Sequence, residues 1–168
     1  MTPKRRAFFA ICPALVALDL LSKELAARLL APAVPHEVLG DYVRLTLVYN
    51  RYGAMGLTLG AWSRPAFGAV AVVAIVVLTV MLRRTPPGDR LRAAALSLLT
   101  AGAAGNLWDR LRSGQGVVDF IDVGIGRYRF WTFNVADSAL TIGVIFLALL
   151  MWHEDRVRER RGPGGATG

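Results

Sequence analysis

The sequence predicts an all-α membrane protein with four transmembrane helices, a small extracytoplasmic β-element and both termini in the cytoplasm. Hydrophobic residues make up 54% of the 168 residues and charged residues 19%, which is unusually apolar for a water-soluble chain of this size. Basic residues cluster between the apolar segments rather than spreading evenly along the chain. The length suits a single domain, residues 1–168. Four apolar segments have the length of a membrane-spanning helix, at about residues 7–30, 65–82, 91–108 and 134–152.

The first apolar segment follows a basic stretch, residues 1–6, and covers about residues 7–30. Pro13 is expected to kink it. Asp19 and Lys23 interrupt its second half, four positions apart on one helical face and in the favoured order for an ion pair. Because a charge inside the bilayer costs on the order of 3 kcal/mol on insertion scales, we expect the two side chains to pair. We interpret the pair as part of the scaffold.

The first connection, residues 31–64, is expected to leave the membrane. Pro32 and Pro35 end the preceding helix. Residues 41–50 are rich in Tyr, Val, Leu and Thr and contain neither Gly nor Pro, which predicts a strand. Three glycines follow within ten residues, which predicts a turn or bulge after the strand.

The second and third segments are joined by a short basic turn, residues 83–92. Residues 65–82 contain no charged side chain after Arg64. Residues 91–108 contain five consecutive small residues from Ala101 to Gly105, which would let a neighbouring helix approach closely.

The second connection, residues 109–132, carries two strand-like stretches, 117–123 and 127–132, around a Gly-containing turn. Asn134 is expected to cap the fourth helix, and Asp137 then falls in its first turn, where an anion suits the helix dipole. Residues 153–168 are charged and then rich in glycine, so we expect them to be disordered.

The distribution of basic residues predicts the orientation. Residues 1–6, 83–92 and 153–168 hold 11 Lys or Arg in 32 residues, whereas residues 31–64 and 109–132 hold 7 in 58. By the positive-inside rule the denser group is cytoplasmic, so both longer connections lie outside. The polar residues of the chain then converge on one extracytoplasmic rim: Asp19, Lys23, Asn50, Asn106, Arg110, Asp119, Asn134 and Asp137.

Asp119 and Asp137 are the candidates for catalysis. The strand-like segment between them can fold back and bring the two carboxyl groups together. Two carboxyl groups within hydrogen-bond reach share a proton, so that one can act as a base on water and the other as an acid. The alternative is that each is a separate solvated loop acid or helix cap. Asp122 is odd-spaced from Asp119 on the expected strand, so its side chain is expected to face water.

The neighbouring amides and arginine have two possible interpretations each. Asn50, Asn106 and Asn134 could orient a peptide backbone or hold the acids, whereas Asn134 could also be only a helix cap. Arg110 could neutralise a carboxylate or bind a lipid headgroup, and it could equally be an interfacial residue whose charged end reaches water.

Other chemistries find little support. His36 and His153 fall on opposite sides of the predicted membrane, so a histidine metal site is not expected. The single cysteine, Cys12, forms no internal disulfide. The net charge of +8 could suit nucleic acid, but long apolar runs separate the arginine clusters, so a membrane is the expected partner instead.

Three blocks resemble the signature of the lipoprotein signal peptidase family, bacterial signal peptidase II. These blocks are Gly105-Asn106-x-x-Asp109-Arg110, Val117-Val118-Asp119-Phe120 and Phe133-Asn134-x-Ala136-Asp137. Asp19 with Lys23, and Asn50 after a strand, match the family in order, and the resemblance covers about residues 7–152.

The resemblance implies an aspartic endopeptidase of the bacterial inner membrane, multi-pass, with its active site at the extracytoplasmic rim. It implies that the enzyme cuts signal peptides from diacylglyceryl-modified prolipoproteins just before the lipidated cysteine, as a monomer in membrane lipid and without cofactor, metal or nucleic acid. Asp119 and Asp137 would be catalytic. The supporting residues would be Asp19, Lys23, Asn50, Asn106, Arg110 and Asn134.

One block departs from the family pattern. Tyr52 stands where the family usually has glycine, and Met55 where it usually has phenylalanine. The loop shape and substrate contacts near Asn50 are therefore expected to differ, without affecting the two acids.

Two other classes of function predict different features. A small transporter or channel subunit would place ionisable residues near the middle of several spans, but the spans at 65–82 and 134–152 contain none near their middle. A non-catalytic scaffold that recruits partners through its arginine-rich segments would keep its function when either acid is neutralised.

Overall fold

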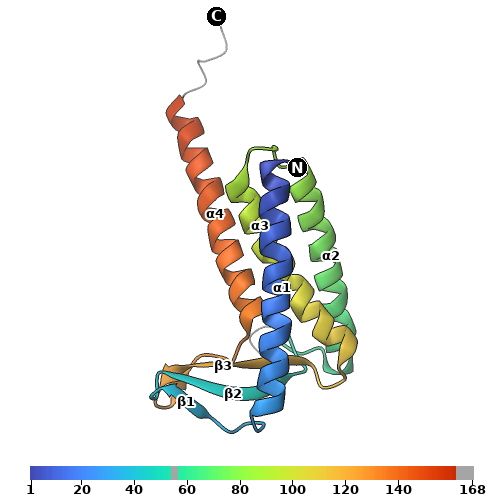
Figure 1. Ribbon diagram of the computed structural model, residues 1–168, viewed down its shortest axis with the longest axis vertical. Helices are drawn as coiled ribbons and strands as arrows, with labels where there is room; N and C mark the ends of the chain where they lie inside the picture. Colours follow the sequence, from blue (N-terminus) through green and yellow to red (C-terminus); the bar gives the residue numbers. More distant parts are fainter. Residues whose placement is uncertain (54–56, 162–168) are drawn as a thin grey trace, which may run out of the picture.

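The computed structural model describes residues 1–53 and 57–161 and consists of four long helices above a small sheet (Figure 1). The third helix is the central one, because it packs against each of the other three. The helices lie at the four apolar segments that the sequence predicts. They are α1 (Pro3–Leu29), α2 (Ser63–Arg84), α3 (Arg90–Arg112) and α4 (Val135–Arg161).

Small residues of α3 allow this close packing, as the sequence predicts. A Cβ atom added at Gly102 would collide with the backbone and side chains of α4, and one added at Gly105 would collide with Asp19 of α1. Ala101 and Ala103 are buried at the same level. The glycines therefore bring α1 and α4 close to α3 at the depth where Asp19 lies.

The sheet has four antiparallel strands in the order β1-β2-β3-β4. The predicted strands over 41–50 and 117–123 are confirmed, with slightly shifted bounds. The strands are β1 (His36–Leu39), β2 (Val43–Asn50), β3 (Val117–Ile125) and β4 (Tyr128–Arg129).

Two strand predictions need correction. β1 was not predicted, because all four of its side chains are exposed and show no alternation of polar and apolar residues. The predicted strand over 127–132 is confined to two residues of β4, because the chain leaves the ladder and turns toward α4. Beyond β4 the backbone N–H of Phe130 still donates to the carbonyl of Val123 at 2.8 Å, and Phe133 and Ile121 exchange backbone hydrogen bonds at 3.0 and 2.8 Å in an isolated bridge.

A bulge sets the register between β2 and β3. Leu45 pairs with Ile121, but Val48 pairs with Asp119, so β2 gains one residue between these two pairs. Asn50 lies two residues beyond Val48 and therefore on the same face of the sheet as Asp119.

The prediction that residues 153–168 are disordered is wrong for the part that the structure describes. α4 continues without a break to Arg161, and residues 162–168 lie outside the described residues. Two contacts support the extension. Arg92 of α3 donates to Glu154 Oε1 at 2.6 Å, and the Arg156 guanidinium lies 4.7 Å from the centre of the Trp152 ring. Glu and Arg are also good helix formers, which favours propagation past the apolar segment.

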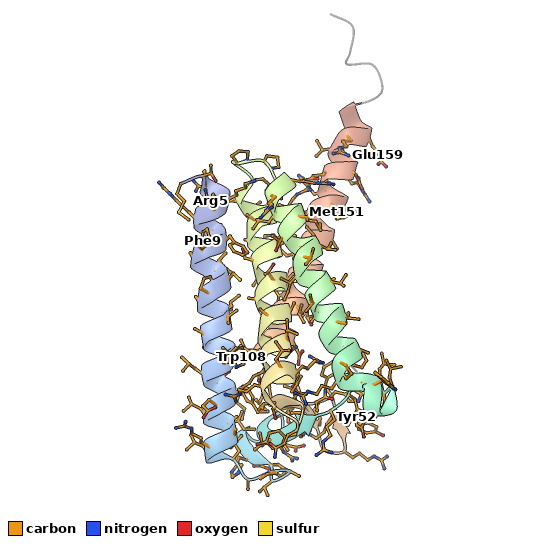
Figure 2. All side chains as sticks on the ribbon, turned by 90° about the vertical axis from the view of Figure 1, so that its right-hand side faces the viewer. Arg5, Phe9, Tyr52, Trp108, Met151 and Glu159 are labelled. Atoms are coloured by element: carbon orange, nitrogen blue, oxygen red, sulfur yellow. The ribbon has the colours of Figure 1, made fainter. Side chains whose placement is uncertain are left out.

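Two of the described helical stretches are long and apolar enough to cross a membrane, Gly60–Arg84 with a mean hydropathy of 2.6 and Val135–Arg160 with 2.0. The beginning of α1 and the end of α4 lie at the end of the bundle opposite the sheet (Figure 1). Figure 2 places Arg5 and Glu159 at that end, and Tyr52 and Trp108 toward the sheet. The chain is thus mostly helical, with a small antiparallel sheet at one end.

Candidate active site

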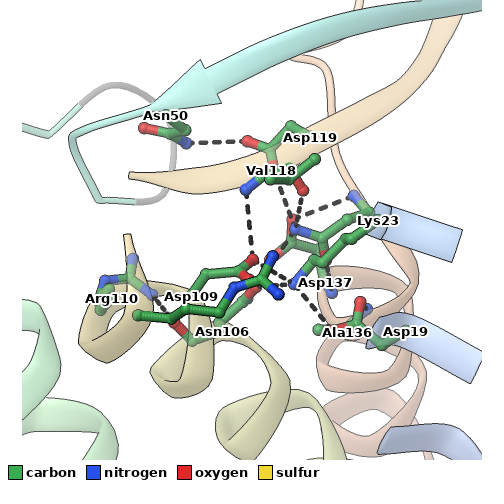
Figure 3. Close-up of polar contacts among 12 residues, drawn as sticks. Asp19, Lys23, Asn50, Asn106, Asp109, Arg110, Val118, Asp119, Ala136 and Asp137 are labelled. Atoms are coloured by element: carbon green, nitrogen blue, oxygen red, sulfur yellow. Dashed lines mark hydrogen bonds and ion pairs between the residues drawn. The ribbon is translucent and has the colours of Figure 1, made fainter. Parts of the chain in front are cut away.

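Asp119 and Asp137 lie at the junction of the sheet and the bundle, joined through one asparagine (Figure 3). Asp119 is on β3 and Asp137 in the first turn of α4. The side-chain amide of Asn134 donates to Asp119 Oδ1 at 2.6 Å, and its backbone N–H donates to Asp137 Oδ2 at 3.3 Å. The fold therefore brings together two carboxyl groups that are 18 positions apart in the sequence.

Asn134 is also the helix cap that the sequence predicts. Its Oδ1 accepts from the backbone N–H of Asp137 at 2.9 Å, while Asp137 accepts in return from the backbone of Asn134. This reciprocal pair is a capping box. The cap and the site are thus one arrangement, in which the start of α4 fixes the position of the Asp137 carboxylate.

Two further asparagines each donate to one of the acids. Asn50, at the end of β2, donates from Nδ2 to Asp119 Oδ2 at 3.1 Å. Asn106, on α3, donates from Nδ2 to Asp137 Oδ1 at 2.7 Å. Each carboxyl group thus accepts hydrogen bonds on both oxygens, which fixes its orientation.

Lys23 is buried, and its ammonium group contacts three polar side chains next to the acids. Its Nζ lies 2.8 Å from Asp19 Oδ2 and 3.0 Å from Asp109 Oδ2, and it donates to Asn106 Oδ1 at 3.0 Å. Only 1% of Lys23 is exposed, so the predicted Asp19–Lys23 pair is confirmed as an internal ion pair. Because Lys23 is only a donor, it requires the oxygen of Asn106 to face it, which turns the amide nitrogen toward Asp137.

Asp19 connects this cluster to α4, since its Oδ1 accepts from the backbone N–H of Ala136 at 2.8 Å. That N–H belongs to the first turn of α4, where the helix leaves backbone donors free.

Asp109 was not predicted as a site residue, although it lies in one of the three signature blocks. It is 2% exposed, pairs with Lys23, and accepts from the backbone N–H of Val118 at 3.3 Å. The available signal was its spacing, since position 109 lies three residues after Asn106 on the same face of α3.

Arg110 lies at the rim of the cluster. Its Nη1 donates to the carbonyl of Asn106 at 3.0 Å, and its guanidinium lies 5.9 Å from the centre of the Phe67 ring. Within the described part of the chain it forms no ion pair with a carboxylate, so it does not neutralise an acid by direct contact. A cavity of about 450 Å³ opens beside it and beside Asn50.

The expectation that Asp122 faces water is wrong. Asp122 is 6% exposed, accepts from Arg129 Nε at 2.6 Å and from Thr46 Oγ1 at 3.1 Å. The arginine on β4 covers the carboxylate, which alternation along β3 could not reveal. None of its described partners belongs to the cluster around Asp119 and Asp137.

The loop after Asn50 contains the two departures from the family pattern. The backbone N–H of Tyr52 donates to Asn50 Oδ1 at 2.9 Å, which leaves the Asn50 amide nitrogen for Asp119. Tyr52 has 50% of its surface exposed and lines the cavity. Met55 lies outside the described residues.

The electrostatics favour one proton on the pair of acids. Burial and, second to it, the nearby Asp137 charge together raise the pKa of Asp119 to about 7, against the opposing hydrogen bonds from Asn50 and Asn134. A carboxyl group that is neutral near pH 7 can donate a proton in a reaction. Among the residues searched, no group of three or more His, Cys, Asp or Glu side chains could hold a metal ion.

Comparison with known proteins gives a consistent result. Residues 11–153 match the family described as "Signal peptidase (SPase) II". The chain is 39% identical over 146 residues to a lipoprotein signal peptidase of Paraburkholderia phytofirmans, covering 86% of this chain and 80% of that protein. It is 41% identical over 158 residues to that of Pseudomonas syringae pv. tomato, covering 92% and 91%, respectively.

Two solved structures share the fold. One is a bacterial membrane enzyme at 2.3 Å resolution, with a TM-score of 0.81, 30% identity and coverage of 88% of both chains. The other, also a bacterial membrane enzyme, at 1.9 Å, has a TM-score of 0.77, 31% identity and coverage of 86% of this chain and 91% of that one.

Proposed function

This chain belongs to the signal peptidase II family, and from that premise we propose that Asp119 and Asp137 are its catalytic pair. It is a membrane-bound aspartic peptidase that removes signal peptides from prolipoproteins. The single observation that carries the residue assignment is that Asn134 holds both carboxyl groups at once. A transporter or scaffold subunit is not favoured.

In the proposed reaction Asp119 is the acid and Asp137 the base. Asp137 takes a proton from water, whose oxygen forms a bond with the carbonyl carbon of the scissile peptide. The C–N bond then breaks as Asp119 gives its proton to the leaving nitrogen. The pair ends with the same number of protons as it began, and transfer of one proton from Asp137 to Asp119 resets it.

The other six residues support the pair. Asn50, Asn106 and Asn134 aim the carboxyl groups, and Asp19 with Lys23 fixes the amide of Asn106 and the start of α4. Arg110 borders the cavity, where it would contact substrate or lipid.

The four helices are proposed to cross the bacterial inner membrane in a single domain that acts as a monomer, with both termini cytoplasmic and the pair of acids at the extracytoplasmic rim. The arginine distribution supports this orientation. Further support comes from the beginning of α1 and the end of α4, which lie at the opposite end of the bundle from the sheet. Trp62 and Trp108, exposed near the sheet end, are suited to the membrane interface.

The substrate is proposed to present a cysteine that already carries a diacylglyceryl group. A lipid anchor would hold the scissile bond at the depth of the two acids and raise its local concentration. Purified protein incubated with lipidated and unlipidated forms of one prolipoprotein should cleave the lipidated form at least tenfold faster, as followed by mass spectrometry. Equal cleavage of both forms would show that the lipid is not required. It would not contradict the assignment of the two acids.

The pH dependence of cleavage follows from the raised pKa of Asp119. Below about pH 7 Asp119 keeps its proton and can act as the acid, whereas above it both carboxyl groups are ionised and no acid remains. We expect kcat/KM to fall about tenfold per pH unit well above pH 7. The profile is measured between pH 5 and 9 on protein shown to stay folded, and a rate that still rises at pH 9 would contradict the assignment.

A variant provides a matched control for this profile. Asn50→Ala removes a hydrogen bond that favours the charged form of Asp119, so the pKa of Asp119 should rise. The alkaline decline should then move to higher pH, even if the maximal rate is lower. A variant with a lower rate and an unmoved decline would show that Asp119 does not set the profile.

A further inference from the structure

Gly116 directly precedes β3 and lies against the backbone at the end of β2. Its φ of +108° is in the region that favours glycine. A Cβ atom added there would collide with the carbonyl oxygen of Asn50, and it would lie 2.6 Å from the carbonyl carbon of Asn50 and 2.8 Å from the backbone nitrogen of Arg51. All three atoms belong to the backbone, so no change of side-chain rotamer can relieve the collision. Position 116 therefore accepts only glycine while Asn50 keeps its place.

This close approach is important for the site because Asn50 holds one of the two acids. Asn50 Nδ2 donates to Asp119 Oδ2 at 3.1 Å (Figure 3). Since carbon atoms that are not bonded pack at about 3.5 Å, a Cβ atom at position 116 would require the two backbones to separate by about 1 Å. A hydrogen bond that is already 3.1 Å long is lost when its donor moves away by this amount.

The start of β3 is the more firmly held of the two segments. Val117 and Val118 are 3% and 4% exposed, and the backbone N–H of Val118 donates to Asp109 Oδ2 at 3.3 Å. On the other side, Arg51 is exposed and lies outside the strands. A side chain at position 116 is therefore expected to displace the end of β2 rather than the start of β3.

We propose that Gly116 is a positioning residue for the cleavage reaction, because the absence of a side chain at this position lets the backbone of Asn50 pack against the start of β3 and places the Asn50 amide on Asp119. Gly116 acts through Asn50 and does not touch the reacting atoms. The inference rests on the proposed role of Asp119 as the acid of the pair.

Gly116→Ala should reproduce the effect of removing the Asn50 amide. The hydrogen bond from Asn50 favours the charged form of Asp119, so its loss raises the pKa of Asp119. The alkaline decline of kcat/KM should then move to higher pH by at least about half a pH unit, as in Asn50→Ala. The maximal rate should fall at least about tenfold, because the acid is no longer held in place. The profile is measured on a lipidated prolipoprotein, with folding checked by thermal melting in detergent.

The double variant Gly116→Ala/Asn50→Ala tests whether Gly116 acts through Asn50. Once the amide is absent, its position has no further effect on Asp119. The double variant should therefore have the same alkaline decline as Asn50→Ala alone, because two residues that act on the same hydrogen bond are not additive.

Gly126→Ala is the matched control, since Gly126 directly follows β3 as Gly116 directly precedes it. Its φ of +55° is also positive, but a Cβ atom added there meets nothing within 4 Å. The substitution thus carries the cost of a positive φ without the collision. The cleavage rate per folded molecule and the alkaline decline should both stay at their wild-type values.

A second variant keeps the test independent of how well Gly116→Ala folds. Gly116→Ala/Arg51→Gly adds a glycine opposite the new Cβ atom, which gives the chain at the end of β2 more freedom to move away from it. This protein should fold and should show the same shift of the alkaline decline. Arg51→Gly alone keeps Gly116, so its decline should not move.

Four results would overturn the inference. They are an unmoved decline in a folded Gly116→Ala protein, a further shift in the double variant with Asn50→Ala, an equal shift in Gly126→Ala, and failure of both Gly116 variants to fold. The last result would show that the fold as a whole requires this glycine. Asn50→Ala separates this inference from the proposed function, because its decline should move even if that of Gly116→Ala does not. An unmoved decline in Asn50→Ala would instead contradict the role of Asp119.

Discussion

Replacing Lys23 with Met is expected to lower the free energy of unfolding by about 3–5 kcal/mol, because it leaves two buried carboxylates without their cation. Asp19 and Asp109, which flank Lys23 at 2.8 and 3.0 Å, are 1% and 2% exposed, so water cannot replace the lost partner. The Asn106 amide would also lose the donor that fixes its orientation, and cleavage per folded molecule should fall. Stability is measured by unfolding of the purified protein in detergent.

Arg28→Met on the same helix is the matched control. Arg28 pairs with Glu24 at 2.7 Å across four positions, but 73% of its side chain is exposed. An exposed pair of this kind contributes little to stability, because water screens the two charges. If Lys23→Met were as stable as Arg28→Met, the buried cluster would not hold the site together.

Replacing Asp119 or Asp137 with Asn is expected to slow cleavage about 10⁴-fold, because each change removes a group that must give or take a proton. Asparagine keeps the size of the side chain, and thermal melting in detergent checks that each variant is folded. The rate per folded molecule on a lipidated prolipoprotein is the measurement. A folded variant of either position that cuts at nearly the wild-type rate would end the aspartic assignment for that residue.

Asp122→Asn separates catalysis from the loss of a buried acid on the same strand. Asp122 lies three positions from Asp119 and is buried, but it pairs with Arg129 rather than with the site. Its substitution should lower stability by about 1–3 kcal/mol through the lost charged hydrogen bond. Cleavage per folded molecule should stay within a few-fold of wild type. Destabilisation alone could then not explain the loss of cleavage in the Asp119 and Asp137 variants.

Local pattern predicted the parts of the site that depend on one element. Helix-length apolar segments placed α1 to α4, and the spacing of Asn134 and Asp137 predicted the cap at the start of α4. The spacing of Asp19 and Lys23 predicted their ion pair. The cap and the ion pair each join residues three or four positions apart, which are neighbours on the surface of a single helix.

Contacts between separate elements were harder to predict. The burial of Asp109 depends on α3 meeting both Lys23 of α1 and the backbone of β3. The burial of Asp122 depends on Arg129 folding back from β4. Likewise, the bulge between Leu45 and Val48 sets how β2 faces Asp119, and no local pattern in β2 indicates where an extra residue enters the ladder.

The most direct test of the central claim is the residual cleavage rate of the Asp119→Asn/Asp137→Asn double variant. If the two acids share one proton and activate one water, either substitution removes the whole unit. Long incubations with a lipidated prolipoprotein, followed by mass spectrometry, should then give the double variant the same residual rate as the slower single variant. Losses that multiply in the double variant would contradict the account, because they would show two acids that act independently.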